Sequence, residues 1–158
     1  MGDVFIMYVR CMEQDDKNDF LRLSEKFYNS GATNRSYDKS LSEKTFEQVI
    51  KKHENLWGYL MLDKTTEEVL GYALVTSYWC NEEGGNVIIL DELYIDETNR
   101  HKGYAKQFME WVEKEFKEDA VSITLEVVTT NIAAKLLYAK EGYFGDGFEI
   151  LSKRLKTV

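Results

Sequence analysis

The chain has 158 residues, 44% of them hydrophobic and 30% charged, and this size and balance suit a folded domain rather than a disordered, fibrous or collagen-like protein. Its formal net charge of -8 argues against a role on nucleic acid, whose phosphates require a basic surface, and favours cationic partners. We therefore expect one domain over residues 1–158 that binds no nucleic acid.

No segment approaches the roughly 20 consecutive apolar residues that a membrane span needs, and the N-terminal residues lack the pattern of a secretion signal. The sequence therefore predicts a cytoplasmic protein that does not associate with a membrane. Cys11 and Cys80 lie far apart, outside any spacing typical of a zinc site or a disulfide framework. We expect two buried thiols and no metal.

The first part of the chain predicts one strand and two helices. Residues 4–11 are rich in β-branched and aromatic residues, as strands are. Apolar residues then recur at helical spacing over residues 20–28 and again over residues 42–50, where Ser42 is the expected N-cap. A polar loop separates the two helices.

Three strand-like segments follow, at residues 56–62, 69–79 and 87–95. The spacers between them are short and rich in turn residues, and the second contains the pair Gly84 and Gly85. Such spacers are typical of hairpins, so the three strands should run antiparallel.

The last part of the chain alternates helices and strands. We expect a helix over residues 104–116, a strand over 121–127, a helix containing residues 132–137, and a final strand over 148–155. The strand-helix-strand stretch ending at residue 127 should be a right-handed crossover between parallel strands. The predicted fold class is therefore α/β (mixed α+β), with one mixed sheet.

The turn before the helix at residue 104 is the first candidate site. It consists of Arg100, His101, Lys102, Gly103, Tyr104 and Ala105. The N–H groups at a helix N-terminus lack partners and lie at the positive end of the helix dipole, so main-chain donors there can hold a diphosphate. Gly103 and Ala105 keep the surface free of bulk, and Arg100 and Lys102 add positive charge. The alternative is an ordinary solvated first turn.

Asn131 and Tyr138 are the second candidate pair. They are seven residues apart on one predicted helix and so lie two turns apart on the same face. A phenol beside a cofactor can donate a proton to a departing thiolate. The alternatives are a helix cap for Asn131 and a core position for Tyr138.

Asp91 and Glu92 are the third candidate pair, because they interrupt an otherwise apolar run. Carboxylates in such a run cost free energy if they are buried, so they either face water at an edge or serve a function. A carboxylate here can attract an ammonium group and accept its proton, directly or through water.

Together these segments resemble the GNAT superfamily of N-acetyltransferases. Arg100, Gly103 and Ala105 match its signature R/Q-x-x-G-x-G/A, which follows the central strand and its Leu93-Tyr94-Ile95. The second signature is matched by Leu125-Glu126-Val127, Asn131, Ala134, Leu137-Tyr138 and Glu141-Gly142-Tyr143. The sequence departs from the commonest pattern at His101 and Ala105, where Gly is frequent, and in the absence of a proline before Arg100.

The resemblance implies the GNAT fold, with a twisted mixed sheet of about six to seven strands flanked by four helices. It implies that acetyl-CoA is the acyl donor, with its diphosphate on the amides of Arg100 to Ala105. The pantetheine would pair with the backbone of Leu93, Tyr94 and Ile95, where a bulge commonly separates two strands. Asn131 would approach the cofactor, and Tyr138 would be the general acid on the CoA sulfur.

The function predicted on this basis is direct transfer of an acetyl group to a primary amine of a small molecule or peptide. Asp91 or Glu92 would be the base and the Leu93 N–H the oxyanion donor. A cluster of Tyr72, Tyr78 and Trp79 would suit a polyamine acceptor, as in spermidine/spermine acetyltransferases. The alternatives are a non-catalytic CoA-binding module or a nucleotide-binding protein unrelated to CoA. A homodimer is possible, as in many relatives.

Overall fold

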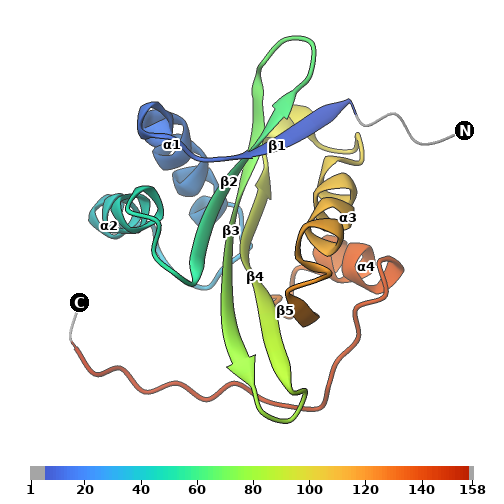
Figure 1. Ribbon diagram of the computed structural model, residues 1–158. Helices are drawn as coiled ribbons and strands as arrows, with labels where there is room; N and C mark the ends of the chain where they lie inside the picture. Colours follow the sequence, from blue (N-terminus) through green and yellow to red (C-terminus); the bar gives the residue numbers. More distant parts are fainter. Residues whose placement is uncertain (1–5, 157–158) are drawn as a thin grey trace, which may run out of the picture.

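The computed structural model describes residues 6–156 and contains one five-stranded sheet in the order β1-β2-β3-β4-β5 (Figure 1). The strands are β1 (Met7–Cys11), β2 (Leu56–Asp63), β3 (Val69–Cys80), β4 (Gly85–Ile95) and β5 (Ala120–Leu125). The helices are α1 (Lys17–Asn29), α2 (Lys39–Ile50), α3 (Tyr104–Phe116) and α4 (Ile132–Lys140). The four helices and the mixed sheet confirm the predicted fold class.

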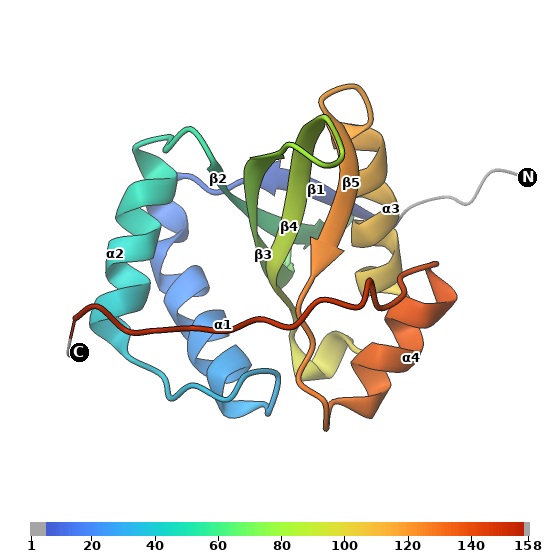
Figure 2. The same cartoon turned by 90° about the horizontal axis from the view of Figure 1, so that it is seen from below.

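The helices cover the sheet in two layers, with α1 and α2 on one face and α3 and α4 on the other (Figures 1 and 2). Each face has its own hydrophobic core. Phe20, Leu23 and Phe46 are buried between the sheet and the first two helices. Phe108 and Val112 of α3 are fully buried against the opposite face, which we call the α3 face.

The strand directions agree with the sequence-based prediction. The strands β1 to β4 pair antiparallel along the chain, whereas β4 and β5 pair parallel through the crossover helix α3. The hairpin between β3 and β4 turns at Gly84, whose φ of 68° lies in the left-handed region that glycine tolerates.

The predicted count of six to seven strands is wrong for the described residues, because the sheet has five. Residues 148–155 form no strand and instead run as an extended segment across the end of the molecule (Figure 2). A strand exists only where a neighbour accepts its hydrogen bonds, and local sequence does not reveal whether that neighbour is present. Residues 4 and 5 of the first predicted strand lie outside the described residues.

Two smaller predictions are also wrong. The N-cap of α2 is Asp38, whose side chain accepts a hydrogen bond from the Ser40 N–H, whereas Ser42 is buried in the helix with its Oγ 3.0 Å from the Ser24 Oγ. The two thiols are not both buried, because Cys11 is exposed and Cys80 is half-buried. Within residues 6–156, no helix has the length and apolar character to cross a membrane.

Candidate active site

The turn between β4 and α3 has the backbone geometry of an anion-binding loop. His101 and Gly103 have φ values of 61° and 80°, both in the left-handed region, which is uncommon for a residue other than glycine. Gly103 is the N-cap of α3, and its missing side chain leaves the first-turn N–H groups without a side-chain cap. A Cβ at Gly103 would meet only the Gln107 Nε2, at 3.9 Å, so the approach to these amides is open.

The cations of this turn are partly engaged in holding it in place. The Arg100 Nε donates to the Ile95 carbonyl at 3.1 Å, and its guanidinium lies 5.1 Å from the centre of the Tyr94 ring. The Lys102 Nζ lies 3.5 Å from the Asn99 Oδ1. Arg100 therefore fixes the turn against the end of β4, and the main-chain amides are the donors best placed for a ligand.

Unsatisfied polar atoms beside the turn support a polar ligand there. Among the described residues, the Asn99 Nδ2 and the Gln107 Oε1 are buried and have no hydrogen-bond partner. Buried polar groups in folded proteins nearly always find a partner, in the protein, in water or in a ligand. The open amides, the local cations and the Asn99 Nδ2 are donors or positive charges and fit the diphosphate of CoA, whereas the Gln107 Oε1 is an acceptor and does not.

The strands β4 and β5 separate at the residues expected to contact pantetheine. Their pairing runs from Asn86 opposite Ala120 to Leu90 opposite Leu125 and does not continue beyond that pair. Leu93, Tyr94 and Ile95 still pair with β3 on their other side. Their backbone edge toward β5 is therefore available to a ligand that lies between the strands.

The bulge in β4 lies earlier in the chain than the resemblance implies. Leu74 is opposite Glu92 and Val75 is opposite Leu90, so Asp91 is the extra residue of a bulge in β4. The bulge is therefore at Asp91 and not at the residues from Leu93 to Ile95.

The bulge decides which face of the sheet Glu92 occupies. Alternate residues of a strand face the same side, so Glu92 in a regular strand would share the α3 face with Leu90. Leu90 is indeed in the α3-side core, but Tyr94 is in the core beside α1 and α2, and Glu92 contacts α1. The extra residue thus turns Glu92 away from α3 and into the α1 side of the sheet.

Glu92 is held there by two phenols. It accepts hydrogen bonds from the Tyr28 hydroxyl at 2.8 Å and from the Tyr72 hydroxyl at 2.6 Å. Burial raises the pKa of Glu92 above its usual 4.5, and the two hydrogen bonds oppose that rise only in part. Asp91 is more exposed than Glu92. Its pKa is also raised, mainly because nearby protein atoms reduce its contact with water, and to a smaller extent because the negative charge of Glu126 repels it.

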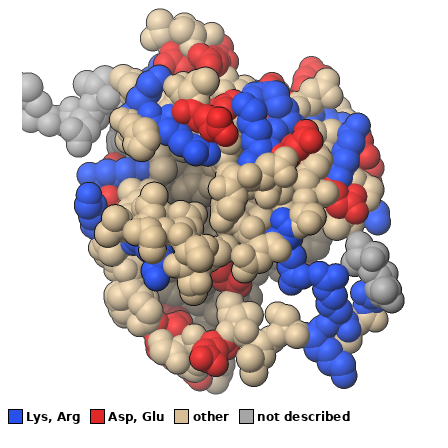
Figure 3. Space-filling view, turned by 180° about the vertical axis from the view of Figure 1, so that it is seen from behind, with Lys and Arg blue, Asp and Glu red and all other residues tan. Residues whose placement is uncertain are grey.

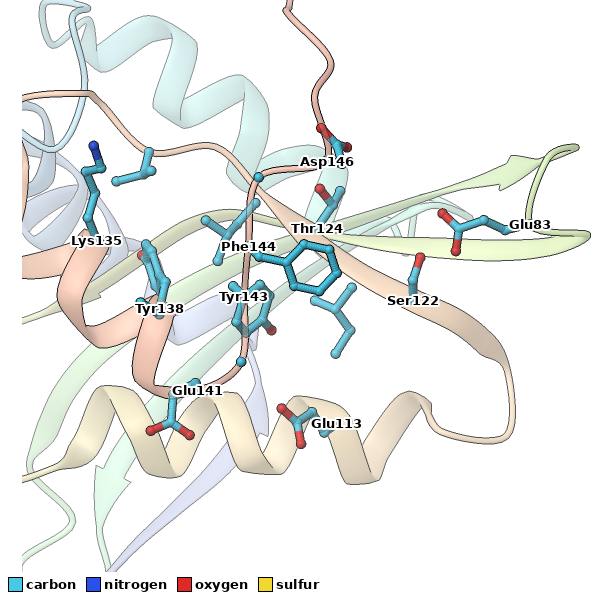
Figure 4. Close-up of a pocket in the computed structure, with 16 residues that line it drawn as sticks. Glu83, Glu113, Ser122, Thr124, Lys135, Tyr138, Glu141, Tyr143, Phe144 and Asp146 are labelled. Atoms are coloured by element: carbon cyan, nitrogen blue, oxygen red, sulfur yellow. The ribbon is translucent and has the colours of Figure 1, made fainter.

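Tyr138 lies on the opposite side of the sheet from Glu92, beside the gap where β4 and β5 separate. It packs on the α3-side core, with its ring centre 6.1 Å from that of Tyr143. With Leu125, the last residue of β5, it lines a hollow of about 730 Å³ (Figure 4). Burial raises the pKa of Tyr138 above its usual 10.0, so the phenol is protonated at neutral pH and can act as a proton donor.

Asn131 is the N-cap of α4. Its Oδ1 accepts a hydrogen bond from the Ala134 N–H at 3.2 Å, and it precedes the first residue of α4. The side-chain Nδ2 has no part in that bond.

Several contacts that shape this region have no signal in the sequence that identifies both partners. Asp96, buried directly after β4, accepts hydrogen bonds at 2.8 Å from both Arg22 and Lys26 of α1. The hydrogen bonds from Tyr28 and Tyr72 to Glu92 are contacts of the same kind. The only signals in the sequence were an acid at the end of a strand and tyrosines on apolar faces, and neither identifies a partner 20 to 74 residues away.

The proposed aromatic cluster is not present. Tyr72 is fully buried beside Glu92, whereas Tyr78 and Trp79 are exposed toward the far end of β3. Only the first of the three can contribute to the site around Glu92.

The sequence is also similar to those of known acetyltransferases. Residues 18–143 match the Acetyltransferase (GNAT) family. The chain is 26% identical over 147 residues to the D-amino-acid N-acetyltransferase HPA3 of Saccharomyces cerevisiae, covering 92% of this chain and 89% of that protein.

Solved structures share the fold. A possible acetyltransferase from Clostridium difficile 630 has a TM-score of 0.83 at 16% identity, over 96% of this chain and 99% of that one. The aminoglycoside N-acetyltransferase AAC(6')-Iy in complex with CoA has a TM-score of 0.76 at 13% identity, over 95% of both chains. The family match over most of the chain shows that this protein belongs to the GNAT acetyltransferase family and is an acyltransferase that uses acetyl-CoA as its donor.

Proposed function

We propose that the protein transfers the acetyl group directly to a primary amine while acetyl-CoA and the amine are bound together. The observation that carries this proposal is the gap where β4 and β5 separate, with Glu92 on one side of the sheet and Tyr138 on the other. A thioester lying in that gap would have a base on the acceptor side and a phenol on the side of its sulfur. This arrangement supports transfer without a covalent acyl-enzyme.

The donor is held mainly by the backbone in this proposal. The diphosphate binds the amides of the segment from Arg100 to Ala105, whose side-chain cap is absent. Pantetheine pairs with the open edge of β4 at Leu93, Tyr94 and Ile95. The Leu93 N–H donates to the oxygen of the thioester carbonyl, where negative charge develops.

Two side chains carry the proton transfers that need a positioned group. Glu92 accepts a proton from the substrate ammonium, and the neutral amine nitrogen then attacks the thioester carbon. The attacking nitrogen loses its second proton to solvent, the carbon–sulfur bond breaks, and Tyr138 gives its proton to the departing thiolate and regains one from solvent. We favour Glu92 over Asp91 as the base, because two phenols fix its carboxylate and it is half-buried, whereas Asp91 is exposed.

The acceptor side supports an amine-rich substrate. Glu92 lines a small cavity of about 50 Å³ together with Tyr28, Asp38 and several hydroxyl side chains. None of the described residues lining it is Lys or Arg, so a substrate carboxylate would have no cation beside it. By its charge, the cavity therefore suits a polyamine or an aminoglycoside better than an amino acid, and its small volume admits only one amino group, with the rest of the substrate outside. The relative HPA3 is named for D-amino acids.

The test is release of CoA thiol from acetyl-CoA with a panel of amines. The panel should contain a polyamine, an aminoglycoside, a peptide and a D-amino acid. We expect turnover with the polyamine or the aminoglycoside at a higher kcat/KM than with the D-amino acid. Turnover of the D-amino acid alone would contradict the acceptor class, and binding of acetyl-CoA without turnover of any amine would contradict catalysis.

A further inference from the structure

Asp96 joins α1 to the end of β4 through a buried carboxylate. It follows β4 directly and is only 7% exposed. One of its carboxylate oxygens accepts a hydrogen bond from Arg22 and the other from Lys26, both at 2.8 Å. Across the upper part of the face in Figure 3, by contrast, basic and acidic side chains alternate at the surface, where ion pairs contribute little to stability. A buried carboxylate with two charged partners holds them more firmly.

Hydrogen bonds hold α1 on two opposite flanks. Successive residues of a helix are about 100° apart, so Arg22 and Lys26 share one flank, and Tyr28 lies about 200° further round the helix than Lys26. Phe20 and Phe27 lie between these flanks and are buried against the sheet. Apolar packing is non-directional and leaves a helix some freedom to turn about its axis. The directional bonds on both flanks remove that freedom.

Tyr28 is the contact of α1 with the proposed base. Its hydroxyl donates to the Glu92 Oε1 at 2.8 Å, and both side chains line the cavity of about 50 Å³. Tyr72 donates to the other carboxylate oxygen, but it belongs to β3, which pairs with β4 directly. The bond from Tyr28 is therefore the one that depends on where α1 lies.

The ionisable groups around Glu92 come from four elements. Tyr28 of α1 and Tyr72 of β3 donate to its carboxylate, Asp91 precedes it in β4, and Asp38, the N-cap of α2, lines the same cavity. Burial raises the pKa of Glu92, the hydrogen bonds from the two phenols lower it, and the charge of Asp91 raises it again. Loss of the bond from Tyr28 should therefore raise this pKa further.

We propose that Asp96 is a positioning residue for the acetyl transfer, which holds α1 so that Tyr28 keeps the Glu92 carboxylate charged and oriented. The proposal rests on the proposed function, in which Glu92 is the base. It adds that a contact on the far flank of α1 sets how well this base works. Asp96, Arg22 and Lys26 are not among the described residues that line the cavity, so they act through the helix and not on the substrate.

The pH profile of kcat/KM for the amine is the readout, measured at saturating acetyl-CoA with the best acceptor of the amine panel. Tyr28→Phe removes only the hydroxyl. It should move the rise of kcat/KM to higher pH and lower kcat/KM roughly tenfold at the acid end of the profile. Asp96→Asn should move the rise in the same direction but less far.

A double variant shows whether Asp96 acts through Tyr28. If it does, adding Asp96→Asn to Tyr28→Phe moves the rise no further. A rise that Asp96→Asn leaves in place, or moves equally with and without Tyr28→Phe, overturns the proposal. If Asp96→Asn does not fold by circular dichroism, Lys26→Gln replaces it with the same expectations, because it leaves the pair between Arg22 and Asp96 intact.

Asp16→Asn is the matched control. Asp16 is also 7% exposed, and it accepts two hydrogen bonds from Arg10 of β1. It lies directly before α1, whereas Asp96 binds the helix nearer to Tyr28. Asp16→Asn should lower the free energy of unfolding and leave the rise of kcat/KM in place. An equal shift of the rise in Asp16→Asn and Asp96→Asn would reflect a general loosening of α1 and overturns the proposal.

Glu92→Gln separates this proposal from the proposed function, because the rise of kcat/KM should disappear in that variant. A rise that remains shows that Glu92 is not the base, and both proposals fall. If the rise disappears in Glu92→Gln but stays in place in Tyr28→Phe and Asp96→Asn, the base stands and the role of Asp96 falls.

Discussion

At the scale of single residues, Tyr138 is the proposed proton donor because its phenol is half-buried beside the gap between β4 and β5. The change Tyr138→Phe removes only the hydroxyl and keeps the ring in the core. We expect kcat to fall roughly ten- to a thousandfold, as is typical for loss of a general acid. The Kd for acetyl-CoA should change by less than about threefold. Steady-state kinetics and calorimetry measure both, and unchanged turnover would remove Tyr138 from this role.

Glu92 provides the matching prediction for the base. Glu92→Gln keeps the shape and an oxygen that can accept from a phenol, but it cannot accept the proton. We expect kcat/KM to fall roughly a hundredfold or more. The rise of kcat/KM with pH that reports Glu92 deprotonation, centred above the usual pKa of 4.5, should also disappear.

The substitution Glu92→Gln should also change how the stability of the protein depends on pH. Because the folded pKa of Glu92 is raised, the folded state binds this proton more tightly than the unfolded state. The free energy of unfolding of the wild type should therefore decrease as pH rises from about 4.5 through the folded pKa, relative to Glu92→Gln. Parallel stability profiles for the two proteins, from urea unfolding at each pH, would contradict the raised pKa.

The sequence suggests residue roles only where a local motif carries them. Gly103 and Tyr138 are candidates because their spacing to other residues is short and typical of a family, and their roles stay predictions. The two phenols on Glu92 were not found, because Tyr28 is 64 residues away in the chain and Tyr72 is 20 residues away. Contacts of that kind depend on the register of the strands and the packing of α1.

At the scale of secondary-structure elements, the bulge in β4 sets the side of the sheet on which the base lies. Deleting Asp91 should restore a regular strand, so that one half of β4 must turn its side chains to the other face. We expect a loss of about 3 kcal/mol or more in the free energy of unfolding, because Glu92 or a core residue becomes misplaced. Urea unfolding measures this loss.

Asp91→Asn is the control for that deletion, because it keeps the extra residue and removes only the charge. It should retain the fold and turnover within about threefold. If the deletion were as stable and as active as Asp91→Asn, the bulge would have no role in placing Glu92.

The N-terminus of α3 carries the second prediction at this scale. His101→Asp adds a carboxylate to the turn, and Asp tolerates the left-handed conformation at that position. Repulsion of the diphosphate should raise the Kd for CoA roughly tenfold or more. His53→Asp makes the same change in the exposed loop between α2 and β2 and should leave the Kd within about twofold. Equal effects of the two changes would contradict binding at this turn.

Most elements could be predicted from hydrophobic period and turn residues, but their ends and partners could not. The alternation in residues 148–155 is compatible with a strand, and yet the described structure offers no neighbour to pair with it. Serine is a good cap, so the sequence favours Ser42 as the N-cap of α2, whereas Asp38 takes that role four residues earlier. The bulge at Asp91 has no signature in the sequence.

At the scale of the whole molecule, the proposed function requires an acidic protein to bind a polyanionic cofactor at one end of the gap in its sheet and an amine at the other. The net charge of -8 favours a cationic acceptor, and we propose that main-chain amides, rather than the overall charge, hold the donor. Asp96 ties α1 to the end of β4 through Arg22 and Lys26. The helix that carries Tyr28 is therefore fixed relative to the strand that carries Glu92.

Amide hydrogen exchange with and without CoA tests most directly whether the cofactor binds at the turn before α3 and along β4. We expect CoA to slow exchange at residues 101–106 and at Leu93 to Ile95, while the amides of α2 exchange as before. No protection at residues 101–106 under saturating CoA, or protection confined to the face of α1 and α2, would contradict it.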